Sequence, residues 1–215
     1  LKTIILRPKL NRFVANKNNY QRNSYSASFV VKKQFSDTSE EGLAFIYATE
    51  GSTLDSLHED LFKQISREKK GGAGNATSST MDILNKLPRW FVKFFIWLMR
   101  QLDRHGIVPK AIIEADPYYA SVILSNLGSI KLRSGYHHLT NWGTTSLFVV
   151  VGEMKERIFR NEKGEDECRN SVDLGLTIDE RLADGYYYSK SVRLLKYILE
   201  HPECLERPFS EPVDY

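Results

Sequence analysis

The sequence predicts an α/β fold in which helices pack on a mixed β-sheet. Apolar and polar side chains alternate over residues 24–35, as they do on a strand with a buried face. Leucine and isoleucine recur at helical spacing over residues 54–65, which indicates an amphipathic helix. Strand-like and helix-like segments mix without strict alternation along the rest of the chain. This order favours a mixed sheet over an all-parallel one.

The composition is that of an ordinary globular protein. The chain has 215 residues, enough for one large domain, and a net charge of +3. This charge is too small to indicate a nucleic-acid partner, and no apolar run is long enough to cross a bilayer. Cys168 and Cys204 have neither metal nor redox spacing, so we expect reduced thiols and a cytoplasmic protein. Leu1 stands where an initiator Met is usual, and we expect further residues upstream.

The first part of the chain predicts a helix end, two strands and a helix. Residues 7–13 pass from a helix into an extended segment, because the proline among them disfavours helical angles in its predecessor. Strands are expected over 24–35 and 42–49. Residues 52–53 cap a helix that runs to about Lys69. Its buried stripe is expected to consist of Leu54, Leu57, Leu61 and Ile65.

A linker and a hydrophobic helix follow. Residues 70–80 are rich in Gly, Ala, Ser and Thr, which is typical of a mobile linker. Residues 81–105 are the most hydrophobic part of the chain, with Pro88 suited to the first helical turn and Gly106 to the end. One side of this helix carries Phe91, Phe94, Phe95, Leu98 and Leu102. Another carries Arg89, Lys93, Arg100 and Arg104, with Trp90 and Trp97 at the margins.

Three roles stay open for this helix. It covers the sheet or a neighbouring subunit, which is the commonest fate of a broad apolar face. It walls an apolar acyl or substrate channel. Or residues 88–104 attach the protein to a membrane surface, which the basic residues and tryptophans suggest.

The second half of the chain predicts two strands, a hairpin and a closing helix. Strands are expected over 118–124 and 144–152, and a hairpin over 155–178. The first of these strands ends in a polar turn, Ser125–Gly128. The last helix is expected over 186–199.

Five short motifs, taken in order, resemble one family. Asp-Glu-Arg-Leu-Ala-Asp-Gly at 179–185 resembles the Asp-His-Arg-x-x-Asp-Gly loop of 2-oxo acid dehydrogenase acyltransferases and of chloramphenicol acetyltransferase. Ser-Asn-Leu-Gly at 125–128 is similar to a turn of that family, and Pro8–Asn11 to its Pro-x-Leu-Asn. The strand at 146–152 and the hairpin tip at 163–165 match as well.

The resemblance implies a chloramphenicol acetyltransferase-like fold, a two-layer α/β sandwich with a mixed sheet. It implies one domain over 1–215 that lacks the family's N-terminal helix and strand, with 71–112 as a divergent or inserted segment. It also implies a homotrimer with active sites at subunit interfaces. The substrates would be a coenzyme A or lipoyl-type thioester and a small acyl acceptor, and no metal is expected.

The resemblance also implies the site residues, and each has a plainer alternative. Ser125 stands at the family's oxyanion donor, although the residues alone favour a turn serine that satisfies backbone groups. Glu180 replaces the histidine that serves as general base. Burial in an apolar interface makes a carboxylate more basic, so we expect either a working base or a lost one. A lost base would leave a non-catalytic scaffold or a membrane-associated subunit.

Two further features complete the expected site. Asp184 is expected to support the loop through an ion pair or hydrogen bond, for example with Arg181. His137 and His138 are adjacent and make a poor metal pair, because neighbouring side chains of an extended segment point apart. They are expected to be structural, with a replacement general base as the alternative. The sequence identifies no coenzyme-binding residues.

Overall fold

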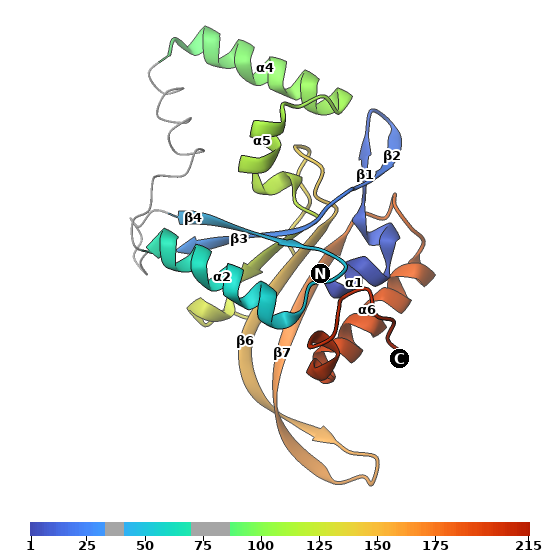
Figure 1. The fold of residues 1–215 in the computed structure, drawn as a ribbon. Helices are drawn as coiled ribbons and strands as arrows, with labels where there is room; N and C mark the ends of the chain where they lie inside the picture. The colour runs from blue at the N-terminus through green and yellow to red at the C-terminus, as the bar shows by residue number, and fades with distance from the viewer. Residues whose placement is uncertain (33–40, 70–86) are drawn as a thin grey trace.

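A mixed five-stranded sheet forms one layer of the protein and helices form the other (Figure 1). The structure, a computed structural model, describes residues 1–32, 41–69 and 87–215. The strands lie in the order β4-β3-β5-β6-β7; β5 is parallel to both neighbours, and the outer pairs are antiparallel. Their bounds are β3 Tyr25–Lys32, β4 Glu41–Ala48, β5 Val122–Asn126, β6 Leu147–Arg160 and β7 Asp166–Ile178. The predicted α/β class with a mixed sheet is confirmed.

Three helices cover one face of the sheet, namely α1 Lys2–Leu6, α2 Leu54–Lys69 and α6 Gly185–Glu200 (Figure 1). The main core lies beneath α1 and the 3-10 turn after it, where Ile4 and Leu10 pack with Val122 and Leu147. Burying such side chains stabilises the fold by about 1.5–3 kcal/mol each. The core therefore joins the start of the chain to the centre of the sheet.

The predicted buried stripe of α2 is wrong at its first position. Leu54 is exposed, and Leu57, Leu61 and Ile65 are half-buried. The helix packs against β4, which is an edge strand of the sheet. An edge strand provides apolar partners on one flank, and this leaves part of the stripe in contact with water.

The strand predicted over 118–124 has different bounds in the structure. The strand expected over 118–124 starts at Val122, because Pro117–Tyr119 forms a 3-10 turn capped by the Asp116 carboxylate, which accepts from the Tyr118 amide (2.9 Å). The same strand includes Ser125, which is therefore a strand residue and not the start of a turn. The 3-10 turn Gly128–Ile130 follows it.

The strand expected over 144–152 and the first half of the expected hairpin form one strand. β6 runs without a break from Leu147 to Arg160, with an irregular register between Val151 and Met154. The second half of β6 and the first half of β7 extend away from the sheet as a long arm (Figure 1). The predicted turn lies at the tip of this arm, where the Asn161 amide donates to the Glu165 carbonyl (2.9 Å).

The helix predicted between Pro88 and Gly106 is present as α4, Arg89–His105. Gly106 ends it with a φ of 70°, a left-handed conformation that glycine adopts without strain. No residue of α4 is buried, so in a single chain it does not cover the sheet, and that part of the expectation is wrong. Within the described ranges, no helix combines the length and apolar character needed to cross a membrane. The linker expected over 70–80 lies outside the described residues.

Three short elements were not predicted. The strands β1 Arg12–Ala15 and β2 Asn18–Gln21 form a separate hairpin, and α5 Lys110–Ala115 follows α4. The turn of the hairpin is made by Asn16 and Lys17, both with positive φ. Because no glycine stands there, these residues do not form a strong hairpin signal.

The face opposite the helices is crossed by the segment that follows β5. The Leu127 amide donates to the Val151 carbonyl, and the Glu153 amide to the Leu132 carbonyl, each at 2.9 Å. The segment passes so close to β6 and β7 that a Cβ atom on Gly175 would lie 1.8 Å from the Gly135 carbonyl oxygen. A side chain at this position would push the segment off the sheet.

We therefore expect Gly175→Ala to lower the free energy of unfolding by about 1–3 kcal/mol, as forced overpacking does. Denaturant unfolding followed by circular dichroism measures this change. Gly51→Ala is the matched control, because a Cβ atom there meets nothing within 4 Å. Equal stability of the two variants would contradict the close packing of this segment.

Candidate functional site

The loop between β7 and α6 is held by Asp179. The backbone amide of Asp179 donates to the Ser146 carbonyl (3.0 Å), which continues the pairing of β7 with β6. Its carboxylate is buried and accepts from Nε (2.8 Å), Nη2 (2.6 Å) and the backbone amide (3.1 Å) of Arg181. The Tyr188 hydroxyl donates to its carbonyl oxygen. This role of Asp179 was not predicted, although the Asp-x-Arg spacing at 179–181 is a signal for it.

The pKa values of this cluster reflect the same contacts. Burial alone raises the pKa of Asp179, but the hydrogen bonds and charge of Arg181 outweigh it, so that pKa is lowered overall. Burial and the neighbouring Asp179 charge raise the pKa of Tyr188 to about 12. Asp179 is therefore ionised and Tyr188 protonated at neutral pH, which keeps each in its observed role as acceptor and donor.

Asp184 caps helix α6. Its carboxylate accepts from the Tyr187 backbone amide (2.8 Å), as an N-cap residue does. The suggested pairing of Asp184 with Arg181 is wrong, because Asp179 binds the Arg181 guanidinium. Asp184 therefore fixes the point at which the loop turns into the helix.

Glu180 lies between these two anchored residues and points into solvent. It is exposed, and its carboxylate has no hydrogen bond or ion pair with any residue that the structure describes. Because Asp179 and Asp184 are both held, Glu180 has little freedom to fold back onto its own chain. Its carboxylate is available to a molecule outside the chain.

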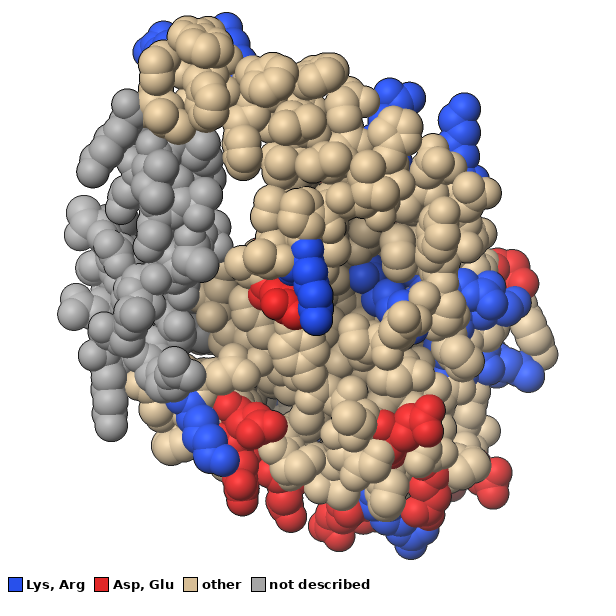
Figure 2. Space-filling view, turned by 45° about the horizontal axis from the view of Figure 1, so that its top comes forward, with Lys and Arg blue, Asp and Glu red and all other residues tan. Residues whose placement is uncertain are grey.

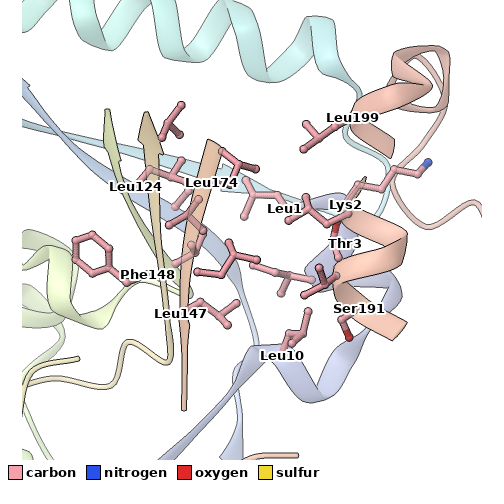
Figure 3. Close-up of a pocket in the computed structure, with 18 of the residues that line it drawn as sticks. Leu1, Lys2, Thr3, Leu10, Leu124, Leu147, Phe148, Leu174, Ser191 and Leu199 are labelled. Carbon is pink, nitrogen blue, oxygen red and sulfur yellow. The ribbon is translucent and has the colours of Figure 1, made fainter. Parts of the chain in front are cut away.

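Ser125 lies near the carboxyl end of β5, beside Val150 of β6. Side chains alternate across a strand, so Ser125 shares a face with Ile123, which packs with Phe148. This is the face opposite the helices; Figure 3 shows Phe148 on the other side of the strands from Leu147. Ser125 is half-buried, and among the described residues its hydroxyl has no partner. Like Glu180, it is free to bind a group from outside.

One chain does not bring Ser125 and Glu180 together. The pairing of Ile178 with Leu147, and of Leu147 with Val122, places the start of the Glu180 loop beside the start of β5. Ser125 lies three residues further along β5, which corresponds to about 10 Å. The two groups are thus at opposite ends of β5, and Glu180 continues away from the sheet.

An apolar cavity that is partly open to solvent lies elsewhere, between the sheet and the helices α1, α2 and α6 (Figure 3). It has a volume of about 420 Å³ and is lined largely by leucine, isoleucine and valine. Lys2 is on its wall, but the Lys2 amine donates to the Pro208 carbonyl (2.9 Å). Ser125, Glu180 and Asp184 line neither this cavity nor the groove between the β6–β7 arm and α6.

The two adjacent histidines lie over the same face of the sheet as Ser125. The His137 ring stacks on Phe148, with ring centroids 4.1 Å apart and planes 6° apart. Its Nδ1 lies 2.8 Å from the His138 carbonyl oxygen. His137 thus has a packing role on this face. Within the part of the chain described, no group of three or more His, Cys, Asp or Glu side chains is arranged to hold a metal ion.

The fold, but not the sequence, is similar to known acyltransferases. Neither a protein-family model nor a curated protein matches the sequence. A dihydrolipoamide acetyltransferase of Azotobacter vinelandii has a TM-score of 0.61 at 13% identity, covering 95% of this chain and 66% of that chain. A probable dihydrolipoamide acetyltransferase of Listeria monocytogenes has a TM-score of 0.59 at 12% identity, covering 93% and 69%. The cubic core of a pyruvate dehydrogenase complex has a TM-score of 0.60 at 12% identity, covering 92% of this chain and 63% of that chain.

These similarities show that the chain has the fold of 2-oxo acid dehydrogenase acyltransferase catalytic domains, as the sequence motifs predicted. The chain spans 63–69% of the length of these three chains. Identities of 12–13% establish the fold alone.

Asp179→Asn should destabilise the protein in a pH-dependent way. A lowered carboxylate pKa contributes stability above the unfolded pKa, near 3.8, and that contribution is lost as the pH falls through the folded value. Because Arg181 is exposed, we expect a loss of only about 1 kcal/mol at pH 7. Chemical unfolding at pH 7 and pH 3 measures it, and the gap to the wild type should be smaller at pH 3 than at pH 7. Asp173→Asn, which breaks an exposed pair with Arg157, is the control and should change stability less. A gap of the same size at pH 3 and pH 7 would contradict the role of the charge.

Asp184→Ala should lower stability by about 1 kcal/mol through loss of the helix cap. Asp184→Asn keeps a capping oxygen and should restore most of the loss. Thermal unfolding compares the two variants. If alanine and asparagine were equally destabilising, the carboxylate would have a role other than capping.

Proposed function

We propose that this protein is an acyltransferase that moves an acyl group from a coenzyme A or lipoyl-type thioester to a small acceptor. In this proposal three copies of the chain form a homotrimer with its active sites between subunits. Glu180 of one copy is the general base, Ser125 of a neighbouring copy donates to the oxyanion, and Asp184 positions the loop.

The observation that carries the proposal is the separation of two unpartnered polar groups. Glu180 and Ser125 are each without a hydrogen-bond partner among the described residues and lie at opposite ends of β5. Two copies placed side by side can bring one group from each to a shared cleft, which a single copy cannot do. Such a cleft would be built from surfaces that a single chain exposes.

The order and spacing of the residues give further support. The roles of a serine, a histidine and an asparagine in catalysis were investigated in the Azotobacter vinelandii acetyltransferase, where these residues are 52 and 4 positions apart. Ser125, Glu180 and Asp184 occur in the matching order, 55 and 4 positions apart. The residues at the position of the proposed base differ chemically, because this chain has the carboxylate of Glu180 where the other protein has the imidazole of a histidine.

The proposed reaction balances without a further reactant. Glu180 removes a proton from the thiol, hydroxyl or amine of the acceptor, whose electron pair forms a bond to the thioester carbonyl carbon. The carbonyl oxygen becomes an oxyanion that accepts a hydrogen bond from the Ser125 hydroxyl. Collapse of this intermediate breaks the carbon–sulfur bond, and the departing thiolate takes the proton from Glu180. The acyl group passes directly between substrates, with no acyl-enzyme.

One observation favours a second function, a scaffold that has the fold and no turnover. Glu180 is exposed and lines neither the apolar cavity nor the groove beside α6. A base exposed to water in the assembled protein would gain no basicity from its surroundings. The two functions differ in whether a neighbouring subunit encloses Glu180.

Glu180→Gln should lower turnover with acyl-coenzyme A donors by about 10²–10⁴-fold, the usual contribution of a general base. Ser125→Ala should lower it by about 10²–10³-fold, as removal of an oxyanion donor does. The release of coenzyme A thiol, measured with a thiol reagent, reports turnover. Glu162→Gln, a change of another exposed glutamate, should leave the rate unchanged. Coenzyme A binding by calorimetry with no turnover in any assay would favour the scaffold, and absence of binding would contradict the enzyme.

The double change His137→Ala and His138→Ala should leave turnover within about threefold of wild type, because His137 is stacked on Phe148 and serves packing. The thermal midpoint should fall instead. A loss of turnover by more than about 10²-fold at unchanged stability would assign the base to this pair and remove Glu180 from the mechanism.

A further inference from the structure

Helix α4 stands away from the sheet and is attached at one end (Figure 1). Among the described residues, the hydrogen bonds between α4 and the rest of the protein come from the last turn of the helix. Asp103 accepts from the Tyr119 hydroxyl (2.7 Å) and the Gly143 amide (3.3 Å), and the Arg104 carbonyl accepts from the Asn16 amide (3.1 Å). The first three turns project outward from this anchor.

The projecting part carries a strip of exposed aromatic side chains. Trp90, Phe94 and Trp97 are 70%, 53% and 56% exposed, and their spacing places them on one side of the helix. Phe94 and Trp97 stack on each other with centroids 5.9 Å apart. Aromatic rings exposed as a group are typical of a surface that binds another apolar phase.

A basic stripe borders the aromatic strip. At 3.6 residues per turn, Arg89, Lys93, Arg100 and Arg104 fall within an arc of about 60°, next to the two tryptophans. All four side chains are exposed, and within the described part of the chain none forms an ion pair. Asp103, the one acidic residue of α4, faces the body. At the top of the molecule, Figure 2 shows Lys and Arg side chains on either side of a group of residues that are neither basic nor acidic.

We propose that α4 binds the surface of a membrane that contains anionic phospholipid. The aromatic strip would enter the boundary between headgroups and acyl chains, and the basic stripe would lie against the phosphates. Tryptophan is well suited to this boundary, and an amphipathic helix with one basic border binds in the plane of the bilayer. Four charges along one side oppose insertion across the membrane. The proposal does not depend on the proposed acyl transfer.

Negative charge is the property that selects this partner. All the charged residues on the exposed surface of α4 are basic. This surface therefore attracts an anionic surface and repels another basic one. A contact between the α4 helices of two copies would place the two basic stripes against each other, which costs energy. A contact with another part of a second copy is an outcome that the test distinguishes.

Co-sedimentation of the full-length chain with vesicles tests the proposal. We expect binding to phosphatidylcholine vesicles that contain 30% phosphatidylglycerol. Binding should be at least tenfold weaker to pure phosphatidylcholine and should weaken at 0.5 M salt. Brominated lipid should quench the fluorescence of Trp90 and Trp97. Trp142, whose indole is hydrogen-bonded to Asp116, should stay unquenched in a Trp90→Phe, Trp97→Phe variant.

Matched charge variants test the stripe itself. Arg89→Gln with Lys93→Gln should lower vesicle affinity at least tenfold, whereas Arg160→Gln with Lys163→Gln at the tip of the β6–β7 arm, which removes the same number of charges, should not. All of these side chains are exposed, and the thermal midpoint checks that each variant is folded. Equal binding by both variants, or no binding by the wild type, would overturn the proposal. A change of molar mass on altering Trp90 and Trp97, with no vesicle binding, would assign α4 to a protein interface instead.

Discussion

The pairing of the Asp179 carboxylate with Arg181 is the interaction on which the candidate site depends. It bends the chain as it leaves β7 and keeps a buried carboxylate satisfied by three donors from one residue. The Tyr188 hydroxyl ties the same turn to α6, and Asp184 caps that helix. A residue between two such anchors has its direction fixed by the backbone. For Glu180 that direction is outward, toward whatever the assembled protein places there.

The sheet imposes the second constraint. Strand β5 is parallel to β6, and β7 is antiparallel to β6. The end of β7 therefore lies beside the beginnings of β6 and β5. Ser125 lies at the far end of β5, on the face that carries Phe148. In a single chain, this strand pairing keeps the two groups apart. The same architecture therefore accounts for both proposals, an enzyme completed by assembly and a scaffold that is not completed.

Local signals predicted local features well, and long-range features poorly. Pro88 and Gly106 define α4 through backbone angles alone, so the sequence located both ends. The polar neighbours of Ser125 predict a turn, whereas pairing with Val150 keeps Ser125 in β5. The exposure of Leu54 follows from the edge position of β4, which no periodicity reports. The site residues were found through motif resemblance, but the distance between them follows from strand order.

Cross-linking tests the central account most directly, because it needs no substrate. A chain with Ser125→Cys and Glu180→Cys, in a background with Cys168→Ser and Cys204→Ser, is treated with a short bismaleimide and separated under denaturing conditions. If position 125 of one copy faces position 180 of the next, covalent dimers and trimers form, and neither single-cysteine chain gives trimers. Monomers alone, from a protein whose native mass is that of one chain, would contradict an active site shared between subunits.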